Sequence, residues 1–157
     1  MTEEYAQYEV LQVPMEVPPE KEDHVMKELG LKIVDNFMRY GCVCIRNAQL
    51  SMYVDDAWKA CRDFHSMPLS KKYECHHKKH DDEHGGYFGI GEEPPYEEGT
   101  VSHLEDFSVN IRDLRWDDAV WPTSIPEFKP NVLRFISRMK TVGDVVHKAL
   151  QSGLGLR

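Results

Sequence analysis

Eight histidines and 27 acidic residues give this 157-residue chain many potential metal ligands. The most specific chemistry they could support is a facial triad, in which two imidazoles and one carboxylate hold Fe(II) from one side. Two short patterns qualify: His80-x-Asp82, in a charged stretch, and His103-x-Glu105, at the start of an expected strand, where residues two apart face the same way. His147 is the candidate third ligand for the second pattern. Such spacings also arise by chance in a histidine-rich chain, so a helix-surface imidazole is the favoured interpretation of His147.

The densest group of histidines is His76, His77, His80 and His84, within the run HHKKHDDEH. A run with almost no apolar residue predicts a solvated surface loop whose imidazoles titrate near neutrality. Adventitious binding of a transition metal by this loop is the alternative. A structural zinc site that also uses Cys75 is disfavoured, because Cys-His-His lacks the paired spacing of common zinc modules.

Other reactive motifs are weak. Cys42 and Cys44 are expected to be core thiols on one face of a strand. The four cysteines lack framework spacing and a secretion signal, so reduced thiols are expected. Gly89-Ile90-Gly91 begins a dinucleotide fingerprint, but Pro94 stands at the position of its last glycine. The sequence therefore does not predict nucleotide binding.

Length and composition narrow the class of protein. With 41% hydrophobic and 29% charged residues, the chain is expected to form one globular domain over residues 1–157. A net charge of -8 argues against nucleic acid and anionic lipid as partners. No apolar run approaches the roughly 20 residues that cross a bilayer, and the N-terminus does not resemble a signal peptide. A cytoplasmic protein without membrane contact is the expectation.

The first half of the chain is expected to alternate strand and helix. A strand is predicted over Tyr8–Pro14, then a helix that ends at Tyr40 with Gly41 as its stop, then a buried strand over Cys42–Ile45. The apolar face of this helix recurs at three- and four-residue steps, at Met26, Leu29, Ile33, Phe37 and Tyr40.

The second half is expected to be helical at both ends. A helix capped by Ser51 ends before Pro68, a short one follows near Ser70, and a strand runs over Leu104–Ile111. The apolar face expected for the helix after Ser51 consists of Val54, Ala57 or Trp58, Cys61 and Phe64. The face expected for the long last helix consists of Val132, Phe135 or Ile136, Met139, Val142 or Gly143, Val146 and Leu150. Helices with short strands define an α+β class.

Several short segments follow one another in a definite order from about Pro14 to Leu156. They are Ile33–Gly41, Cys42–Asn47, Phe64–Lys72 with its Phe-x-x-x-Pro-x-x-x-Lys spacing, Gly86-Tyr87, Glu105–Ser108, Trp121-Pro122 and the helix closing in Gly153–Leu156. Together they resemble the N-terminal region of the 2-oxoglutarate- and Fe(II)-dependent dioxygenases of the isopenicillin N synthase type. Ala48 departs from the pattern, since that family usually has His there.

The resemblance implies N-terminal helices and short strands that, in the full family, pack on a double-stranded β-helix (jelly roll), which this chain lacks. The family's iron ligands, a His-x-Asp and a distal His, and its Arg-x-Ser for 2-oxoglutarate follow the last helix present here. No catalytic, cofactor-binding or metal residue therefore carries over, and the chain alone is predicted to be inactive. Fe(II) and 2-oxoglutarate are implied only for a complete family member, as is a small-molecule substrate.

The resemblance also places Tyr87, Phe88 and Phe107 beside the mouth of a complete active site; packing under a loop is the competing interpretation. The leading hypothesis is the N-terminal, non-catalytic part of a dioxygenase, truncated or split. The alternative is a stand-alone regulatory module that pairs with a catalytic β-helix domain or subunit. Without that cover, exposed strand edges and an apolar helix stripe are expected. A metal-binding loop protein is the third possibility.

Overall fold

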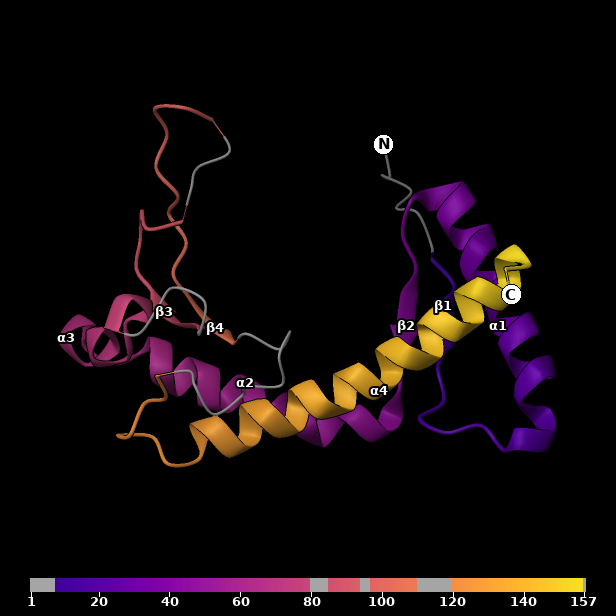
Figure 1. Ribbon diagram of the computed structural model, residues 1–157, viewed down its shortest axis with the longest axis horizontal. Coiled ribbons are helices and arrows are strands. Elements are labelled where there is room, and N and C mark those ends of the chain that lie inside the picture. Colours follow the sequence, from indigo (N-terminus) through magenta and orange to yellow (C-terminus); the bar gives the residue numbers. More distant parts are fainter. Residues whose placement is uncertain (1–7, 80–84, 94–96, 110–119, 157) are drawn as a thin grey trace, which may run out of the picture. The chain divides into compact units, whose positions relative to one another are not determined.

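The computed structural model describes residues 8–79, 85–93, 97–109 and 120–156 (Figure 1). Its helices and strands are β1 (Val10–Gln12), α1 (Glu22–Tyr40), β2 (Cys44–Arg46), α2 (Ser51–His65), α3 (Leu69–Lys72), β3 (Gly85–Phe88), β4 (Asp106–Val109) and α4 (Phe128–Leu154). Short 3-10 turns are η1 (Pro19–Lys21), η2 (Ala48–Leu50), η3 (Tyr73–Cys75) and η4 (His77–Lys79). The predicted α+β class is confirmed, with two two-stranded sheets and no jelly roll among the described residues.

The chain divides into two compact units. The first contains the residues up to Val54 and those from Phe135 onward, and the second is Asp55–Arg134. The prediction of a single domain stays a prediction. No helix in the described part of the chain is long and apolar enough to span a membrane.

A small parallel sheet and two helices build the first unit. β1 pairs in parallel with β2, and the Val13 N–H extends the ladder by donating to the Arg46 carbonyl at 3.0 Å. The core that covers this sheet consists of Leu11, Val13, Met26, Leu29, Ile33, Val142 and Ala149. Residues from both ends of the chain thus close one apolar centre.

Helix α1 begins earlier than the predicted apolar face and ends as predicted. Gly41 has a left-handed backbone (φ 71°) that a residue with a Cβ rarely adopts, and its N–H donates to the Phe37 carbonyl. The predicted face is correct as far as Ile33 but wrong for Phe37 and Tyr40, which are exposed. Because Asn36 is the last buried residue of α1, the final turn lies at the surface.

The strand predicted after this helix is present as β2, but the prediction that it is buried is wrong. Ile45 and Cys42 are exposed, and Cys44 is only half-buried. Among the residues that the structure describes, β2 pairs with β1 in a two-stranded sheet, so its other edge is unpaired there. The core-thiol interpretation therefore fails for Cys42 and holds only in part for Cys44. All four cysteines are free thiols.

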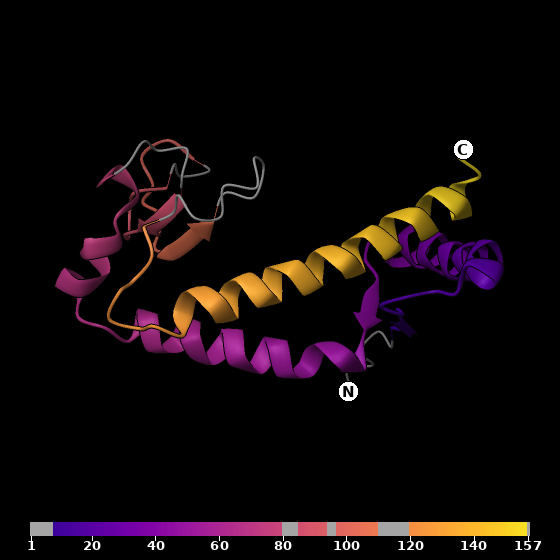
Figure 2. The same ribbon diagram turned by 60° about the horizontal axis from the view of Figure 1, so that its bottom comes forward.

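Glycines allow α1 and α4 to cross closely, as Figures 1 and 2 show at the C-terminal end of α4. A Cβ on Gly30 would lie 1.9 Å from the Ala149 carbonyl oxygen, and one on Gly153 would lie 2.5 Å from the Gly30 carbonyl carbon. At the same crossing the Lys27 ammonium donates to the Ser152 carbonyl at 2.9 Å. Gly153 thus serves the helix crossing, while α4 itself ends at Leu154, close to the predicted stop.

The second unit is organised around aromatic rings. Phe64, at the end of α2, contacts Tyr87, Phe107 and Phe128, with ring centroids 5.1–5.9 Å apart. β3 and β4 pair antiparallel, and their register sets Tyr87 opposite Phe107. Phe64 and Tyr87 are fully buried. The aromatic cluster thereby fixes the hairpin against the end of α2.

The other predicted helices and the predicted strand are present, but some residues expected to be buried on α2 and α4 are exposed. The short helix near Ser70 is α3, and the predicted strand is β4, although Ile111 lies outside the described residues. In α2 the buried residues are Ala57, Ala60 and Phe64, whereas Val54 and Trp58 are exposed. In α4 the buried residues are Phe128, Val132, Val142 and Ala149, and Met139 is exposed.

Candidate functional site: two carboxylate clusters

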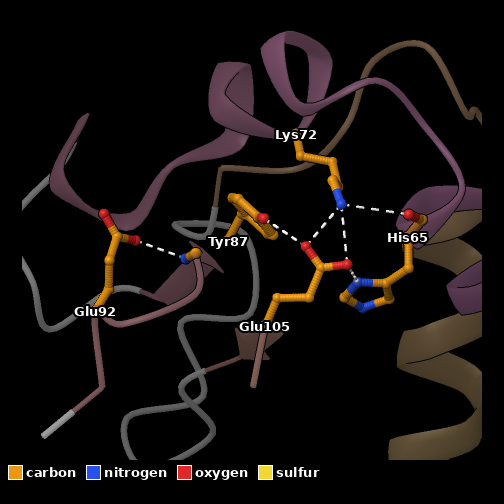
Figure 3. A network of polar contacts seen from close by, with 6 residues as sticks. His65, Lys72, Tyr87, Glu92 and Glu105 are labelled. Carbon is orange, nitrogen blue, oxygen red and sulfur yellow. Dashed lines mark hydrogen bonds and ion pairs between the residues drawn. The ribbon is translucent and has the colours of Figure 1, made fainter. Parts of the chain in front are cut away.

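Two partly buried carboxylates of the second unit, Glu105 and Glu92, each contact several polar groups. Figure 3 shows Glu105 with Lys72, Tyr87 and His65, and shows Glu92 nearby. Glu105 immediately precedes β4, and Glu92 follows the turn after β3. Their partners differ in kind.

Glu105 accepts hydrogen bonds from three side chains. The Lys72 ammonium lies 2.6 Å from Oε2 and 2.9 Å from Oε1. The Tyr87 hydroxyl donates to Oε2 at 2.5 Å, and His65 Nδ1 lies 3.3 Å from Oε1. Lys72 is itself buried and also donates to the His65 carbonyl at 3.3 Å. This network joins the end of α2, α3 and the two strands of the hairpin.

The network shifts two pKa values in opposite directions. Burial alone would raise the pKa of Glu105, but hydrogen bonds from Lys72, Tyr87 and His65 and the charge of Lys72 outweigh it and lower that pKa to about 2. Burial raises the pKa of Tyr87 far above its usual range, and its hydrogen bond to the Glu105 carboxylate adds to the effect. Glu105 is thus a fixed anion and Tyr87 a neutral donor.

This arrangement contradicts the metal interpretation of His103-x-Glu105. Both Glu105 oxygens are occupied by donors, while His103 is exposed and precedes β4. His147, the proposed third ligand, is exposed on α4, in agreement with its helix-surface interpretation. The physical reason is that a nearby ammonium satisfies the carboxylate better than a distant imidazole could. Within the described part of the second unit, His103 and Glu105 belong to no group of metal ligands.

Glu92 is held by the turn that follows β3. The turn runs from Gly89 to Glu92, whose N–H donates to the Gly89 carbonyl at 3.1 Å. Gly91, its third residue, has a positive φ of 80°, which favours glycine. The carboxylate folds back over the turn and accepts the Gly89 N–H at 2.6 Å. A Cβ on Gly89 would lie 2.8 Å from the Tyr73 hydroxyl, so a larger residue there would displace the Tyr73 side chain.

Two consecutive histidines face this carboxylate. His76 Nε2 lies 2.8 and 2.9 Å from the two Glu92 oxygens, and His77 Nε2 lies 3.9 Å from Oε2. The His76 ring stacks on Tyr73 at 5.0 Å and the His77 ring on Phe88 at 3.8 Å. One ligand atom from each of His76, His77 and Glu92 lies within 4.8 Å of the others.

The solvated-loop prediction is therefore wrong for His76 and His77, whose exposed fractions are 9% and 5%. In the folded chain, Tyr73 stacks on the His76 ring and Phe88 on the His77 ring. The charged residues that follow the two histidines in sequence give no sign of this packing. His80 and His84, together with the pattern His80-x-Asp82, lie outside the described residues.

The pKa of Glu92 is lowered, like that of Glu105, but for other reasons. Burial opposes the shift, and the Gly89 N–H, the hydrogen bond and charge of His76 and the charge of Lys78 outweigh it. The side chain of Glu92 is only 19% exposed.

The three residues assigned to a substrate mouth lie around the β3–β4 hairpin. Tyr87 is fully buried, its ring in the aromatic core and its hydroxyl on Glu105. Phe107 is half-buried between Phe64, Trp121 and Phe128. Phe88 is half-buried on the His77 ring. The structure brings Tyr87 and Phe107 together as cross-strand partners, and their role at a mouth stays a prediction.

Sequence reasoning missed the polar partners in both clusters. Lys72 occurs in the Phe-x-x-x-Pro-x-x-x-Lys segment, yet nothing in that spacing indicates that its ammonium is buried on Glu105. Glu92 has a weak signal, because the glycines at positions 89 and 91 indicate a tight turn that could fold the carboxylate back.

Comparison with known proteins gives a structural match. No protein-family model matches the chain, and no curated protein matches it. A crystal structure from Caulobacter crescentus, of a protein assigned provisionally to the 2OG-Fe(II) oxygenase family, matches with a TM-score of 0.67 at 21% identity. The match covers 98% of this chain and 50% of that chain, so this chain spans half of that protein. At this identity the similarity establishes a shared fold.

Proposed function

We propose that this chain is the N-terminal, non-catalytic part of a cytoplasmic Fe(II)- and 2-oxoglutarate-dependent dioxygenase that acts on a small molecule. The observation that supports this most is the structural match, which covers nearly the whole chain but only half of an oxygenase-family protein. The motif order found in the sequence agrees with that origin. Truncation, or division between two chains, is part of the proposal.

The content of the sequence is consistent with a catalytic centre located elsewhere. An Arg-x-Ser triplet, which the family resemblance implies for binding 2-oxoglutarate, does not occur in the 157 residues. Glu105 forms an ion pair with Lys72. Among the described residues, His103 belongs to no group of metal ligands. Fe(II) and 2-oxoglutarate are therefore proposed to bind a β-helix domain, with Phe88 and Phe107 contributing to the substrate mouth.

Exposed apolar side chains support a partner of this kind. Met38 on α1 is 82% exposed and Trp58 on α2 is 68% exposed. Single exposed apolar residues are ordinary, but each unit carries several. A catalytic β-helix, in the same chain or in a separate subunit, is the proposed cover for them.

Two measurements test the proposal. The DNA directly downstream of the Arg157 codon is expected to encode, in frame, a His-x-Asp, a distal His and an Arg-x-Ser. The purified chain is expected to produce no succinate from 2-oxoglutarate and Fe(II), whereas the extended product should turn over. Succinate formation by the short chain, proportional to its concentration and above a protein-free control, would contradict the proposal.

A stand-alone regulatory module that pairs with a dioxygenase subunit is the second candidate, favoured by the same exposed residues. It predicts that the downstream segment is absent and that the chain associates with a partner. Sedimentation of the chain, alone and with a β-helix subunit, measures whether the two associate. A well-folded chain that remains strictly monomeric when a β-helix subunit is added would exclude the regulatory module.

A further inference from the structure

We infer that His76, His77 and Glu92 form a binding site for a divalent transition-metal ion, with Zn²⁺ as the ion of choice. Two imidazoles and one carboxylate on one side of a site are a donor set that zinc and its neighbours in the first transition row bind well. The three ligand atoms already lie within 4.8 Å of one another. This inference does not rest on the proposed function.

The distances suit a small ion after modest adjustment. Zinc binds imidazole nitrogen and carboxylate oxygen at about 2.0–2.2 Å, which separates ligand atoms of a tetrahedral ion by roughly 3.3 Å. His76 Nε2 and Glu92 Oε1 are closer than this, at 2.8 Å, and His77 Nε2 and Glu92 Oε2 are farther apart, at 3.9 Å. Small rotations of the Glu92 carboxylate would even out both distances, and a water would complete the coordination.

The ligands are held in place before any ion arrives. Tyr73 stacks on the His76 ring with an interplanar angle of 17°, and Phe88 stacks on the His77 ring with an angle of 10°. The Gly89 N–H fixes the Glu92 carboxylate. A site whose side chains are already ordered loses less conformational entropy on binding, and packing around the ligands favours one geometry.

The ion would replace a proton. The Lys78 N–H approaches His76 Nδ1 at 3.3 Å, so in the neutral ring Nε2 carries the proton and donates it to Glu92. Binding at Nε2 moves this proton to Nδ1, with loss of the long Lys78 contact, so that the ring stays a neutral ligand. The ion then adds its positive charge to the stabilisation that the Glu92 carboxylate already receives from His76 and the Gly89 amide.

Calorimetric titration of the purified full chain with Zn²⁺, and visible d–d absorption after titration with Co²⁺, test the site. One equivalent is expected to bind. Glu92→Gln keeps an acceptor for the Gly89 N–H, and His77→Phe keeps the stack on Phe88, so both variants should remain folded. Each is expected to weaken binding at least about tenfold, since even the loss of an outer-shell partner costs 10–100-fold.

Matched controls are Glu93→Gln, the adjacent exposed carboxylate, and His103→Ala, an exposed histidine of the same unit. Both are expected to bind as the parent chain does. No stoichiometric Zn²⁺ binding by the parent chain overturns the inference. Unchanged affinity in a folded Glu92→Gln variant does so too, because it would assign the ion to the histidine-rich stretch alone. Thermal melting without metal verifies that each variant is folded.

Discussion

Glu105 and Glu92 are two carboxylates of the same unit with similar burial and different partners. The side chain of Glu105 is 26% exposed and that of Glu92 is 19% exposed. Each has a lowered pKa. Glu105 faces the permanent cation of Lys72, whereas Glu92 faces two imidazoles and a backbone amide. Burial alone does not distinguish them.

The difference shows how the partner decides what a buried carboxylate can do. The Lys72 ammonium, in direct contact, compensates the negative charge of Glu105. Removing either charge would leave the other one buried and uncompensated. An imidazole, by contrast, can be neutral or charged, and its nitrogen can bind a metal ion in place of a proton. Glu105 therefore acts as a structural link, while Glu92 retains the capacity to bind a cation.

The largest expected effect comes from Lys72→Met, which removes the cation and retains the aliphatic stem. Glu105 then remains as an uncompensated carboxylate, and the free energy of unfolding is expected to fall by about 3 kcal/mol. Denaturant unfolding at neutral pH measures it. Lys71→Met is the control, because the Lys71–Glu74 pair is exposed and its loss should cost no more than about 0.5 kcal/mol. Equal losses in the two variants would remove the distinction between the two lysines.

Acid should weaken the fold through Glu105. Its pKa in the folded chain is about 2, below the ordinary value of 4.5, so its contribution is complete above about pH 5 and is lost as the pH falls toward 2. The contribution is on the order of 3 kcal/mol. Unfolding measured from about pH 5 to pH 2 should show a smaller decline for Glu105→Gln than for the parent chain. A parallel decline in both would assign the acid sensitivity to other groups.

Tyr87→Phe should cost about 2 kcal/mol, since it removes one hydrogen bond to a charged acceptor and leaves the aromatic packing intact. It should also raise the pKa of Glu105, because one donor to the carboxylate is lost. NMR titration of the Glu105 carboxyl measures the pKa, and thermal unfolding measures the stability. Tyr73→Phe, at a partly exposed ring in the same unit, is expected to stay within about 0.5 kcal/mol.

The smallest effect is expected for Glu92→Gln in the absence of metal, within about 1 kcal/mol. An amide oxygen at the place of Oε2 can still accept from both Gly89 and His76, so neither donor is left unsatisfied. Glu93→Gln is the neighbouring control. A loss comparable to that of Lys72→Met would show that Glu92, too, is mainly a structural link.

Most of the local structure could be predicted from sequence. Apolar spacing and the glycine at 41 predicted α1, and short β-prone runs predicted β1, β2 and β4 near their observed positions. Burial was harder to predict. Phe37, Ile45 and Trp58 are apolar but exposed, because periodicity predicts an apolar face without specifying how much of it another element covers.

The two clusters could not be predicted in the same way. His76 and His77 are surrounded by charged residues in sequence, and their burial depends on Tyr73 and Phe88. Glu105 was considered as a partner for a histidine two residues away, but the structure pairs it with Lys72, 33 residues earlier. Contacts between distant residues depend on chain topology, which composition and periodicity do not encode directly.

By itself, the sequence determined the α+β class, the C-terminal end of α1 and the acidic balance that disfavours nucleic acid, because these follow from local spacing and net charge. Only the tertiary structure decided which carboxylate receives an ammonium and which receives imidazoles. The physical reason is that a side chain's charge state and ligand capacity depend on the groups within a few ångströms of it, and folding alone brings those groups together.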